Sequence, residues 1–257
     1  MATVLYDSPI FGPIHSRRLG ISLGINLLPA ARKVCSFDCI YCECGFNRSG
    51  TPVTLPTREE VRTALERQLK TMQATNVSPN VLTFAGNGEP TMHPQFAEII
   101  DDTLTLRDAY FPSAKVSVLS NAVHIGSERV FEALKRVDNN ILKLDTINPA
   151  YIRLVNRPRG QYDVPQLIQR MKAFDGRCIV QTMFMTGTFN GTDTDNTTDA
   201  FVLPWVQAVN EIAPRQVMIY TIDRETPADT LRKASPESLN RIAELLRQNG
   251  HDVSVAY

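Results

Sequence analysis

The chain has 257 residues, of which 43% are hydrophobic and 21% are charged, as in an ordinary globular protein. Its 27 basic and 27 acidic residues cancel, so no overall field attracts nucleic acid or an anionic membrane. The first residues lack the charged and apolar regions of a signal peptide, and no apolar stretch approaches the roughly 20 residues that span a bilayer. We therefore expect a cytoplasmic protein without a membrane partner, in which thiols stay reduced.

Apolar, β-branched segments alternate with helical patterns along the chain. Strands are predicted at 21–28, 80–86, 115–121, 140–146, 177–184, 215–222 and 252–257. Helices are predicted at 56–73, 94–108, 127–137, 164–174, 199–212 and 235–248. Thr57 and Glu60 form a plausible capping box at the start of the first helix. The segment 185–199, rich in Asn, Asp and Thr, is interpreted as a lid or surface loop.

This alternation of strands and helices predicts βαβ units and a parallel sheet. Six such units with right-handed crossovers would curl into an open or partial barrel. The pattern indicates one α/β domain over residues 1–257, with residues 1–20 as an N-terminal extension.

Four of the five cysteines lie in the segment "KVCSFDCIYCECGFN" (33–47), at Cys35, Cys39, Cys42 and Cys44. The first three, spaced C-x3-C-x2-C, are suited to hold three irons of a [4Fe–4S] cluster and leave the fourth open. A four-thiolate zinc site is an alternative, although structural zinc ligands usually come as two separated pairs. A thioredoxin-like pair would leave Cys35 without a role, and disulfides are rare in a reducing compartment. The cluster is the favoured interpretation.

Several motifs carry a resemblance to a known family. The cysteine spacing, with the aromatic Tyr41 before the last cysteine, resembles the cluster motif of the radical S-adenosylmethionine (SAM) superfamily. "FAGNGEPT" after the second predicted strand resembles the Gly-Glu motif of these enzymes. The segments "FGPIHSRRLGISLGINLLP", "LKLDT", "NRP" and "YTIDRETP" are similar to the group that includes the tRNA wyosine-synthesis enzymes, so the resemblance covers most of the chain.

The resemblance implies a partial (β/α)6 TIM-like barrel that binds a [4Fe–4S] cluster and SAM and generates a 5′-deoxyadenosyl radical. It implies that 33–47 is the cluster-binding loop, with Cys35, Cys39 and Cys42 as the metal ligands. Backbone groups from Gly86 to Glu89 would hold the methionyl amino group. The full set of implied SAM contacts is Tyr41, Gly86, Asn87, Gly88, Glu89, Ser120, Asn121, Gln181 and Tyr220.

Two further groups of charged residues are candidates for substrate chemistry. Lys143 and Asp145 lie two apart in "LKLDT" and would share one face, either as catalytic residues or as a structural ion pair. Arginines such as Arg157, and Arg17 and Arg18 near His15, would suit a clamp for a carboxylate or phosphate, or be solvated surface charges.

The resemblance predicts an enzyme that abstracts hydrogen from a small molecule or nucleotide, with an electron donor such as flavodoxin or ferredoxin. Wyosine-type tRNA modification is a second possible function, but the second cluster of those enzymes uses cysteines ahead of the main motif. No cysteine precedes Cys35 here, and the neutral charge offers no evident tRNA footprint. Two more functions stay open, namely a glycyl-radical activase and a zinc-binding structural protein.

Overall fold

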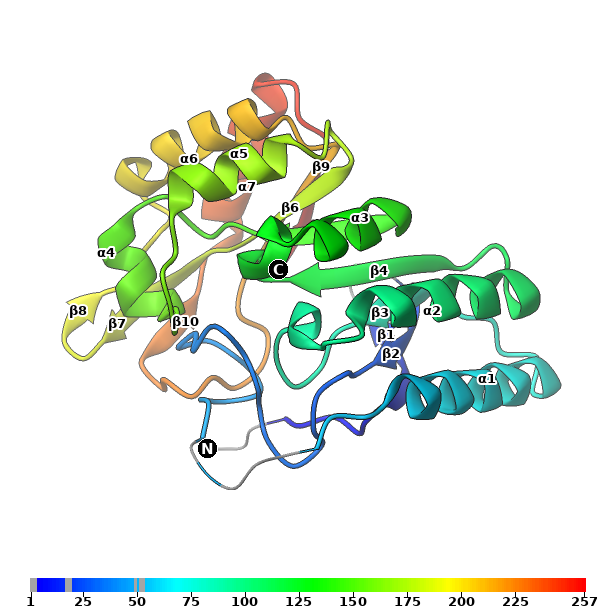
Figure 1. Ribbon diagram of the computed structural model, residues 1–257. Helices are drawn as coiled ribbons and strands as arrows, with labels where there is room; N and C mark the ends of the chain where they lie inside the picture. Colours follow the sequence, from blue (N-terminus) through cyan, green and yellow to red (C-terminus); the bar gives the residue numbers. More distant parts are fainter. Residues whose placement is uncertain (1–3, 17–19, 49, 51–53) are drawn as a thin grey trace.

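The computed structural model describes residues 4–16, 20–48, 50 and 54–257. Eight strands form one curled sheet in the order β1-β2-β3-β4-β5-β6-β9-β11, which makes a half-barrel (Figure 1). All neighbouring strands run parallel except β1 and β2. The strands are β1 Ile10–Ser16, β2 Gly20–Ile25, β3 Val81–Phe84, β4 Lys115–Ser120, β5 Asn139–Lys143, β6 Cys178–Met183, β9 Gln216–Tyr220 and β11 Val253–Ala256. The predicted α/β class and partial barrel are confirmed.

Helices follow the parallel strands and pack against the convex face of the sheet (Figure 1). The predicted capping box is present at the first of them, because the Thr57 and Glu60 side chains each accept a hydrogen bond from the other's backbone. Four short turns, η1 Pro90–Met92, η2 Val123–Gly126, α4 Pro149–Tyr151 and η3 Ile152–Asn156, lie in the connections. The longer helices are α1 Arg58–Ala74, α2 Phe96–Tyr110, α3 Glu128–Arg136, α5 Val164–Lys172, α6 Asp199–Ile212 and α7 Pro236–Gln248.

The main hydrophobic core lies between the sheet and these helices. Trp205 of α6 is 1% exposed, packs edge-on against Phe184, and donates its indole N–H to the Leu144 carbonyl at 2.8 Å. Burial of one such large apolar side chain contributes about 1.5–3 kcal/mol. A separate, smaller cluster of Ile141, Ile179 and Met218 joins three neighbouring barrel strands.

Two predictions of secondary structure are wrong. The segment 10–16 forms β1, which was not predicted as a strand. The segment 185–199 is not a plain loop, since it contains β7 Met185–Phe189 and β8 Thr192–Asp193, and β7 also pairs with β10 Leu231–Lys233. Asn190 and Gly191 have φ values of 51° and 77°, so Asn-Gly forms the tight turn between β7 and β8.

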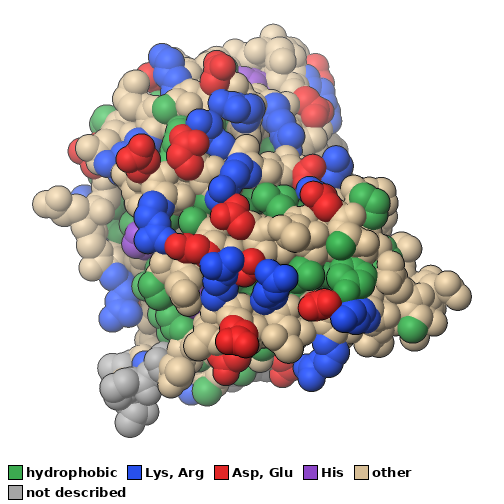
Figure 2. Space-filling model, turned by 45° about the vertical axis from the view of Figure 1, so that its right-hand side comes forward, with side chains coloured by type: hydrophobic (Ala, Val, Ile, Leu, Met, Phe, Trp, Pro, Cys, Tyr) green, Lys and Arg blue, Asp and Glu red, His purple; other side chains and the backbone are tan. Residues whose placement is uncertain are grey.

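The surface carries charges of both signs side by side (Figure 2). Many of them pair between helices, as Arg58 of α1 does with Asp102 of α2 at 2.6 Å. Within the described residues, no helix is both long enough and apolar enough to cross a membrane.

Candidate active site

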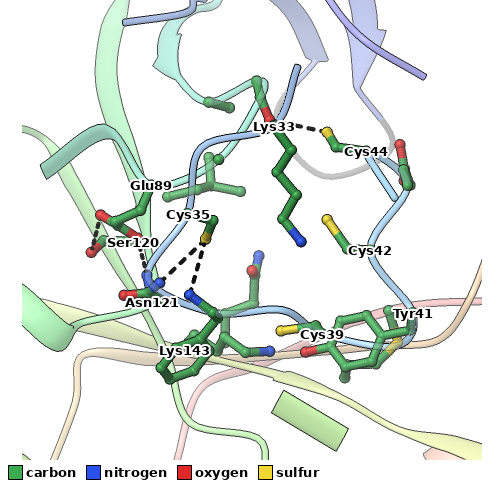
Figure 3. A pocket seen from close by; sticks show the side chains of 18 of the residues that line it. Lys33, Cys35, Cys39, Tyr41, Cys42, Cys44, Glu89, Ser120, Asn121 and Lys143 are labelled. Atoms are coloured by element: carbon green, nitrogen blue, oxygen red, sulfur yellow. Dashed lines mark hydrogen bonds between the residues drawn. The ribbon is translucent and has the colours of Figure 1, made fainter. Parts of the chain in front are cut away.

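The cysteine loop lies over the carboxyl ends of the parallel strands, where barrel enzymes place their sites. Cys35, Cys39 and Cys42 line one cavity of about 300 Å³ there, and their sulfur atoms approach it from different sides (Figure 3). The same cavity is lined by residues from the ends of β4, β5, β6 and β9. The cavity therefore brings the three predicted ligands together with the strand ends that the sequence nominated.

Backbone hydrogen bonds join the start of this loop to the Gly-Glu motif. The Val34 N–H donates to the Asn87 carbonyl at 2.8 Å, and the Glu89 N–H donates to the Val34 carbonyl at 3.2 Å. Between them, Gly88 has φ of +145°, and a Cβ there would lie 1.7 Å from the Val34 oxygen. Only glycine allows this approach, so the motif holds the cysteine loop by its shape.

The three thiols differ in the direction in which their surroundings shift the pKa. Burial raises the pKa of Cys35 to about 12, and burial also raises the pKa of Cys39. The adjacent Cys44 lowers the pKa of Cys42 to about 6, and the Lys33 ammonium also favours this thiolate. Lys33 is 4% exposed and its side chain extends into the cavity between Cys35 and Cys42 (Figure 3). A buried cation here offsets the negative charge of thiolates.

Several N–H groups point at the sulfur atoms. Cys35 Sγ accepts from the Phe37 N–H at 3.4 Å and from Asn121 Nδ2 at 3.6 Å. Cys39 Sγ lies 3.8 Å from Asn156 Nδ2, which donates to it. Hydrogen bonds of this kind set the reduction potential of an iron–sulfur cluster.

The residues fit a [4Fe–4S] cluster better than a single metal ion. No three His, Cys, Asp or Glu side chains in the described part of the chain are close enough together to hold one ion. The three thiols instead surround a shared cavity, and sulfur donors are aided there by a buried cation and by N–H groups. Three thiolates leave one iron of a four-iron cluster open.

Glu89 ties the Gly-Glu motif to the end of β4. Its carboxylate accepts from the Ser120 hydroxyl at 2.9 Å and from the Asn121 N–H at 2.7 Å, and it also accepts from the Thr91 backbone and side chain. Burial raises the pKa of this carboxyl, while those donors oppose the rise. These contacts suit a carboxylate that orients the loop.

Asp145 is the centre of a buried network. Its Oδ2 accepts from Tyr41 Oη, from Lys143 Nζ and from Asn156 Nδ2, the last at 2.8 Å. Its Oδ1 accepts from the Met183 N–H at 3.0 Å. The carboxylate therefore fixes the aromatic ring beside the last ligand cysteine, and it does not line the cavity. Of the two roles left open for Asp145, catalysis and a structural ion pair, these contacts favour the ion pair with Lys143.

Lys143 occupies the border between this network and the cavity. Burial opposes its charge, yet its pKa is raised because the Asp145 carboxylate lies against it. Its Nζ also lies 4.6 Å from the centroid of the Tyr41 ring, a cation–π contact. Lys143 therefore presents a fixed positive charge to the cavity, and this charged form is unsuited to act as a nucleophile.

The predicted SAM contacts converge with one exception. Asn87 is buried and its side chain points away from the cavity, where it accepts from the Tyr6 N–H and donates to the Tyr6 and Pro29 carbonyls. The resemblance implied a contact through backbone groups of Gly86 to Glu89, and Asn87 is the one residue of that set that does not line the cavity. The predicted SAM contacts that line the cavity are Tyr41, Gly86, Gly88, Glu89, Ser120, Asn121, Gln181 and Tyr220.

A second cavity of about 220 Å³ adjoins the first, and both are lined by Tyr6, Glu43 and Gly86. Arg224, which follows β9, donates to Tyr6 Oη at 2.6 Å and to Glu43 Oε2 at 2.7 Å. His15 lines this second cavity as well.

Three other arginines were candidates for the predicted clamp. Arg17 and Arg18 lie outside the described residues. Arg157 lies over the Phe46 ring, 5.0 Å from its centroid, and lines neither cavity.

Sequence reasoning missed three residues of the site, namely Lys33, Asn156 and Tyr6. A lysine two residues before the first cysteine and an asparagine in "NRP" were visible signals for the first two. Nothing in the local sequence of Tyr6 indicates that it reaches Glu43, 37 positions away.

Comparison with known proteins decides the family. A sequence model of the radical SAM superfamily matches residues 33–201, which span the cysteine loop and the strand ends around the cavity. The chain belongs to the radical SAM superfamily. It is therefore an enzyme whose cofactors are a [4Fe–4S] cluster and SAM.

Two relatives are similar to the chain in sequence, and a solved structure is similar in fold. The chain is 27% identical to a Brachyspira hyodysenteriae protein described as GTPase Obg, over 93% of this chain and 34% of that protein. It is 26% identical to a UPF0026 protein of Methanocaldococcus jannaschii, over 93% of this chain and 71% of the relative. This chain therefore spans only about a third of the length of the Brachyspira hyodysenteriae protein. A radical SAM methyltransferase from Sphaerobacter thermophilus has the same fold, with a TM-score of 0.67 at 15% identity, over 91% of this chain and 65% of that one.

Proposed function

We propose that this radical SAM enzyme cleaves SAM reductively and abstracts a hydrogen atom from a small-molecule or nucleotide substrate bound beside the cysteine loop. When bound, the reduced cluster supplies the electron that converts SAM to methionine and a 5′-deoxyadenosyl radical. The observation that carries the proposal is the cavity of about 300 Å³, in which three cysteine thiols meet the polar ends of the barrel strands.

The residues around this cavity divide into two roles. The thiols of Cys35, Cys39 and Cys42 hold the cluster. Lys143 offers a fixed cation that suits the SAM carboxylate, since charge-assisted hydrogen bonds to carboxylates are among the strongest in proteins. Tyr41, held in place by Asp145, offers an aromatic face for the adenine.

Further residues complete the pocket for SAM. The carbonyl of Gly86 and the Gln181 side chain offer polar groups for the amino acid and ribose parts. The Gly86 carbonyl already accepts from Cys44 Sγ at 3.3 Å, which leaves its second lone pair for a ligand. Ser120 and Asn121 line the same cavity and are oriented by Glu89.

The second cavity is the place for the substrate. It adjoins the first, so a substrate there would lie next to the bound SAM, and its volume of about 220 Å³ suits a small molecule or part of a larger one. Ser22 and Thr83, whose hydroxyls are 2.8 Å apart, provide polar groups on its strand side. Arg224 and Glu43, which pair at 2.7 Å, also line this cavity and offer a substrate charged groups of both signs.

The first experiment is an anaerobic assay for SAM cleavage. The protein is reconstituted with iron and sulfide, reduced with dithionite and given SAM, and 5′-deoxyadenosine is measured by mass spectrometry. We expect product from the wild type and from Cys178→Ala, whose cysteine is buried away from the site, and none from Cys39→Ala. A wild-type protein that carries a complete cluster and forms no 5′-deoxyadenosine would contradict the proposal.

A further inference from the structure

The second cavity, which the proposed function assigns to the substrate, is lined by charged groups of both signs. They are Glu43, Asp223 and Arg224, and the exposed His15 is one more titratable group on the lining. Glu43 pairs with Arg224 at 2.7 Å, and Asp223 pairs with Lys233 at 3.7 Å. Among the described residues, the lining therefore offers no excess of positive charge to a phosphate ester. A substrate whose own charges balance is the better match.

The pair of Arg224 and Glu43 keeps hydrogen-bonding groups in reserve. Nη1 of Arg224 donates to Glu43 Oε2 at 2.7 Å and to Tyr6 Oη at 2.6 Å. The Tyr6 hydroxyl donates to the same Glu43 Oε2 at 3.4 Å. Within the described part of the chain, no hydrogen bond engages Nε or Nη2 of the arginine, or Oε1 of the glutamate. The pair can therefore give further donors from one side chain and a further acceptor from the other.

These reserve groups suit the two charges of an α-amino acid. An amino acid carries its ammonium and its carboxylate on neighbouring atoms, and the Arg224–Glu43 pair presents the opposite charges 2.7 Å apart. The carboxylate would accept from the guanidinium and the ammonium would donate to Glu43 Oε1, so that every charge has an opposite neighbour. The side chains of Arg224 and Glu43 are 46% and 40% exposed. Because exposed ion pairs are weak, this pair can adjust to a ligand at little cost.

The rest of the cavity suits a side chain. Phe11, Ile14 and Leu119 contribute apolar walls, while the hydroxyls of Ser22 and Thr83 contribute polar groups on the strand side. The volume of about 220 Å³ is below the roughly 300–1,000 Å³ of sites that enclose drug-sized ligands. The cavity therefore fits a molecule of the size of one amino acid better than a whole nucleotide.

We propose that the substrate is a free α-amino acid, held by its carboxylate on Arg224 and by its ammonium on Glu43. The inference rests on the proposed function and narrows its substrate to one class. Tyr6 and Glu43 line both cavities, so an amino acid held there lies at the border with the cavity assigned to SAM. One hydrogen atom, with its electron, would pass from a carbon of the amino acid to the 5′ carbon of the deoxyadenosyl radical. The amino acid would be left with one unpaired electron.

The first test is binding, measured without turnover. Enzyme with an oxidised cluster and saturating SAM is screened by thermal shift against the twenty L-amino acids of proteins. Calorimetry then gives the Kd of the amino acid that binds best, of its carboxamide, of its N-acetyl derivative and of adenosine 5′-monophosphate. The variants are Arg224→Gln and Glu43→Gln. Arg241→Gln is the matched control, since Arg241 is 47% exposed and pairs with Asp199 away from both cavities.

We expect the wild type to bind the free amino acid about tenfold or more tightly than either derivative, because each derivative loses a charged hydrogen-bonding group. Arg224→Gln should lose the preference over the carboxamide and keep the preference over the N-acetyl derivative. Glu43→Gln should show the reverse. A general loss of structure would not give this crossed pattern. Arg241→Gln should equal the wild type, and Arg224→Gln should bind SAM as the wild type does.

Four binding results would overturn the inference. They are no shift with any amino acid, tighter binding of adenosine 5′-monophosphate than of every amino acid, equal loss of both preferences in each variant, and weaker SAM binding in Arg224→Gln, which would place the pair in the SAM site.

A turnover experiment separates this inference from the proposed function. The reduced enzyme is given SAM and the best-binding amino acid in fully deuterated form, and we expect deuterium in the 5′-deoxyadenosine by mass spectrometry. Product without deuterium would overturn the inference and leave SAM cleavage intact. No 5′-deoxyadenosine from enzyme that binds the amino acid would instead contradict the proposed function.

Discussion

Replacement of Asp145 by asparagine should lower the free energy of unfolding by about 3–5 kcal/mol, the usual effect of breaking a buried ion pair. Asp145 has a side chain only 1% exposed, and its Lys143 partner is 15% exposed. In Asp145→Asn the ammonium loses its counter-charge. An amide nitrogen would also face the hydrogens of Tyr41 and Asn156, which both donate to the same oxygen.

The free energy of unfolding is measured by urea denaturation of the chain before cluster reconstitution. Far-ultraviolet circular dichroism monitors the unfolding. Lys143→Met removes the cation and keeps most of the side-chain volume, so it serves in a double-mutant cycle with Asp145→Asn. Residues in one network usually show coupling of roughly 0.5–3 kcal/mol. The double variant should therefore be more stable than the sum of the two single losses predicts.

Two results would refute this reasoning. A loss below roughly 1 kcal/mol in Asp145→Asn would mean that the ammonium finds water or another partner. Additive losses in the double variant would mean that the two side chains do not act as a pair in solution.

Three further predictions concern the loop and its cysteines. Gly88→Ala should lower iron content after reconstitution and the melting temperature, because its Cβ would lie 1.7 Å from the Val34 oxygen; an unchanged iron content would contradict the close contact. Cys44→Ala should retain iron in full while Cys39→Ala loses most of it, as iron and sulfide analysis will show; equal losses would make Cys44 a ligand. Cys178, whose pKa burial raises to about 11, should stay unmodified by iodoacetamide in the native protein at pH 8 and react after unfolding, as peptide mass mapping can check.

The order of strands and helices was predictable because each barrel strand is a short apolar run followed by an amphipathic helix. The six central strands lie within a few residues of their predicted places. β1 was missed because its sequence, "IFGPIHS", contains Gly12 and Pro13, which are unfavourable in strand interiors. The hairpin of β7 and β8 was missed because polar residues in 185–199 obscured its Asn-Gly turn.

The convergence of the candidate site residues was most predictable where local spacing determines geometry. Three cysteines within eight positions lie on one loop, so their convergence follows from the sequence. Contacts between distant segments were not predictable. Asn156 reaches Cys39 across 117 positions, and such a contact depends on how the barrel closes. The contact of the Asn87 side chain with the Tyr6 carbonyl, 81 positions away, was unpredictable for the same reason.

The backbone bridge between Val34 and Gly88 has a thermodynamic consequence. It makes the cysteine loop and the Gly-Glu turn into one ordered unit, because neither can shift without breaking hydrogen bonds to the other. Any ligand that orders one segment reduces the entropy cost of ordering the other. Binding is reciprocal under these conditions, so the factor by which cluster assembly tightens SAM binding equals the factor by which SAM tightens retention of the cluster.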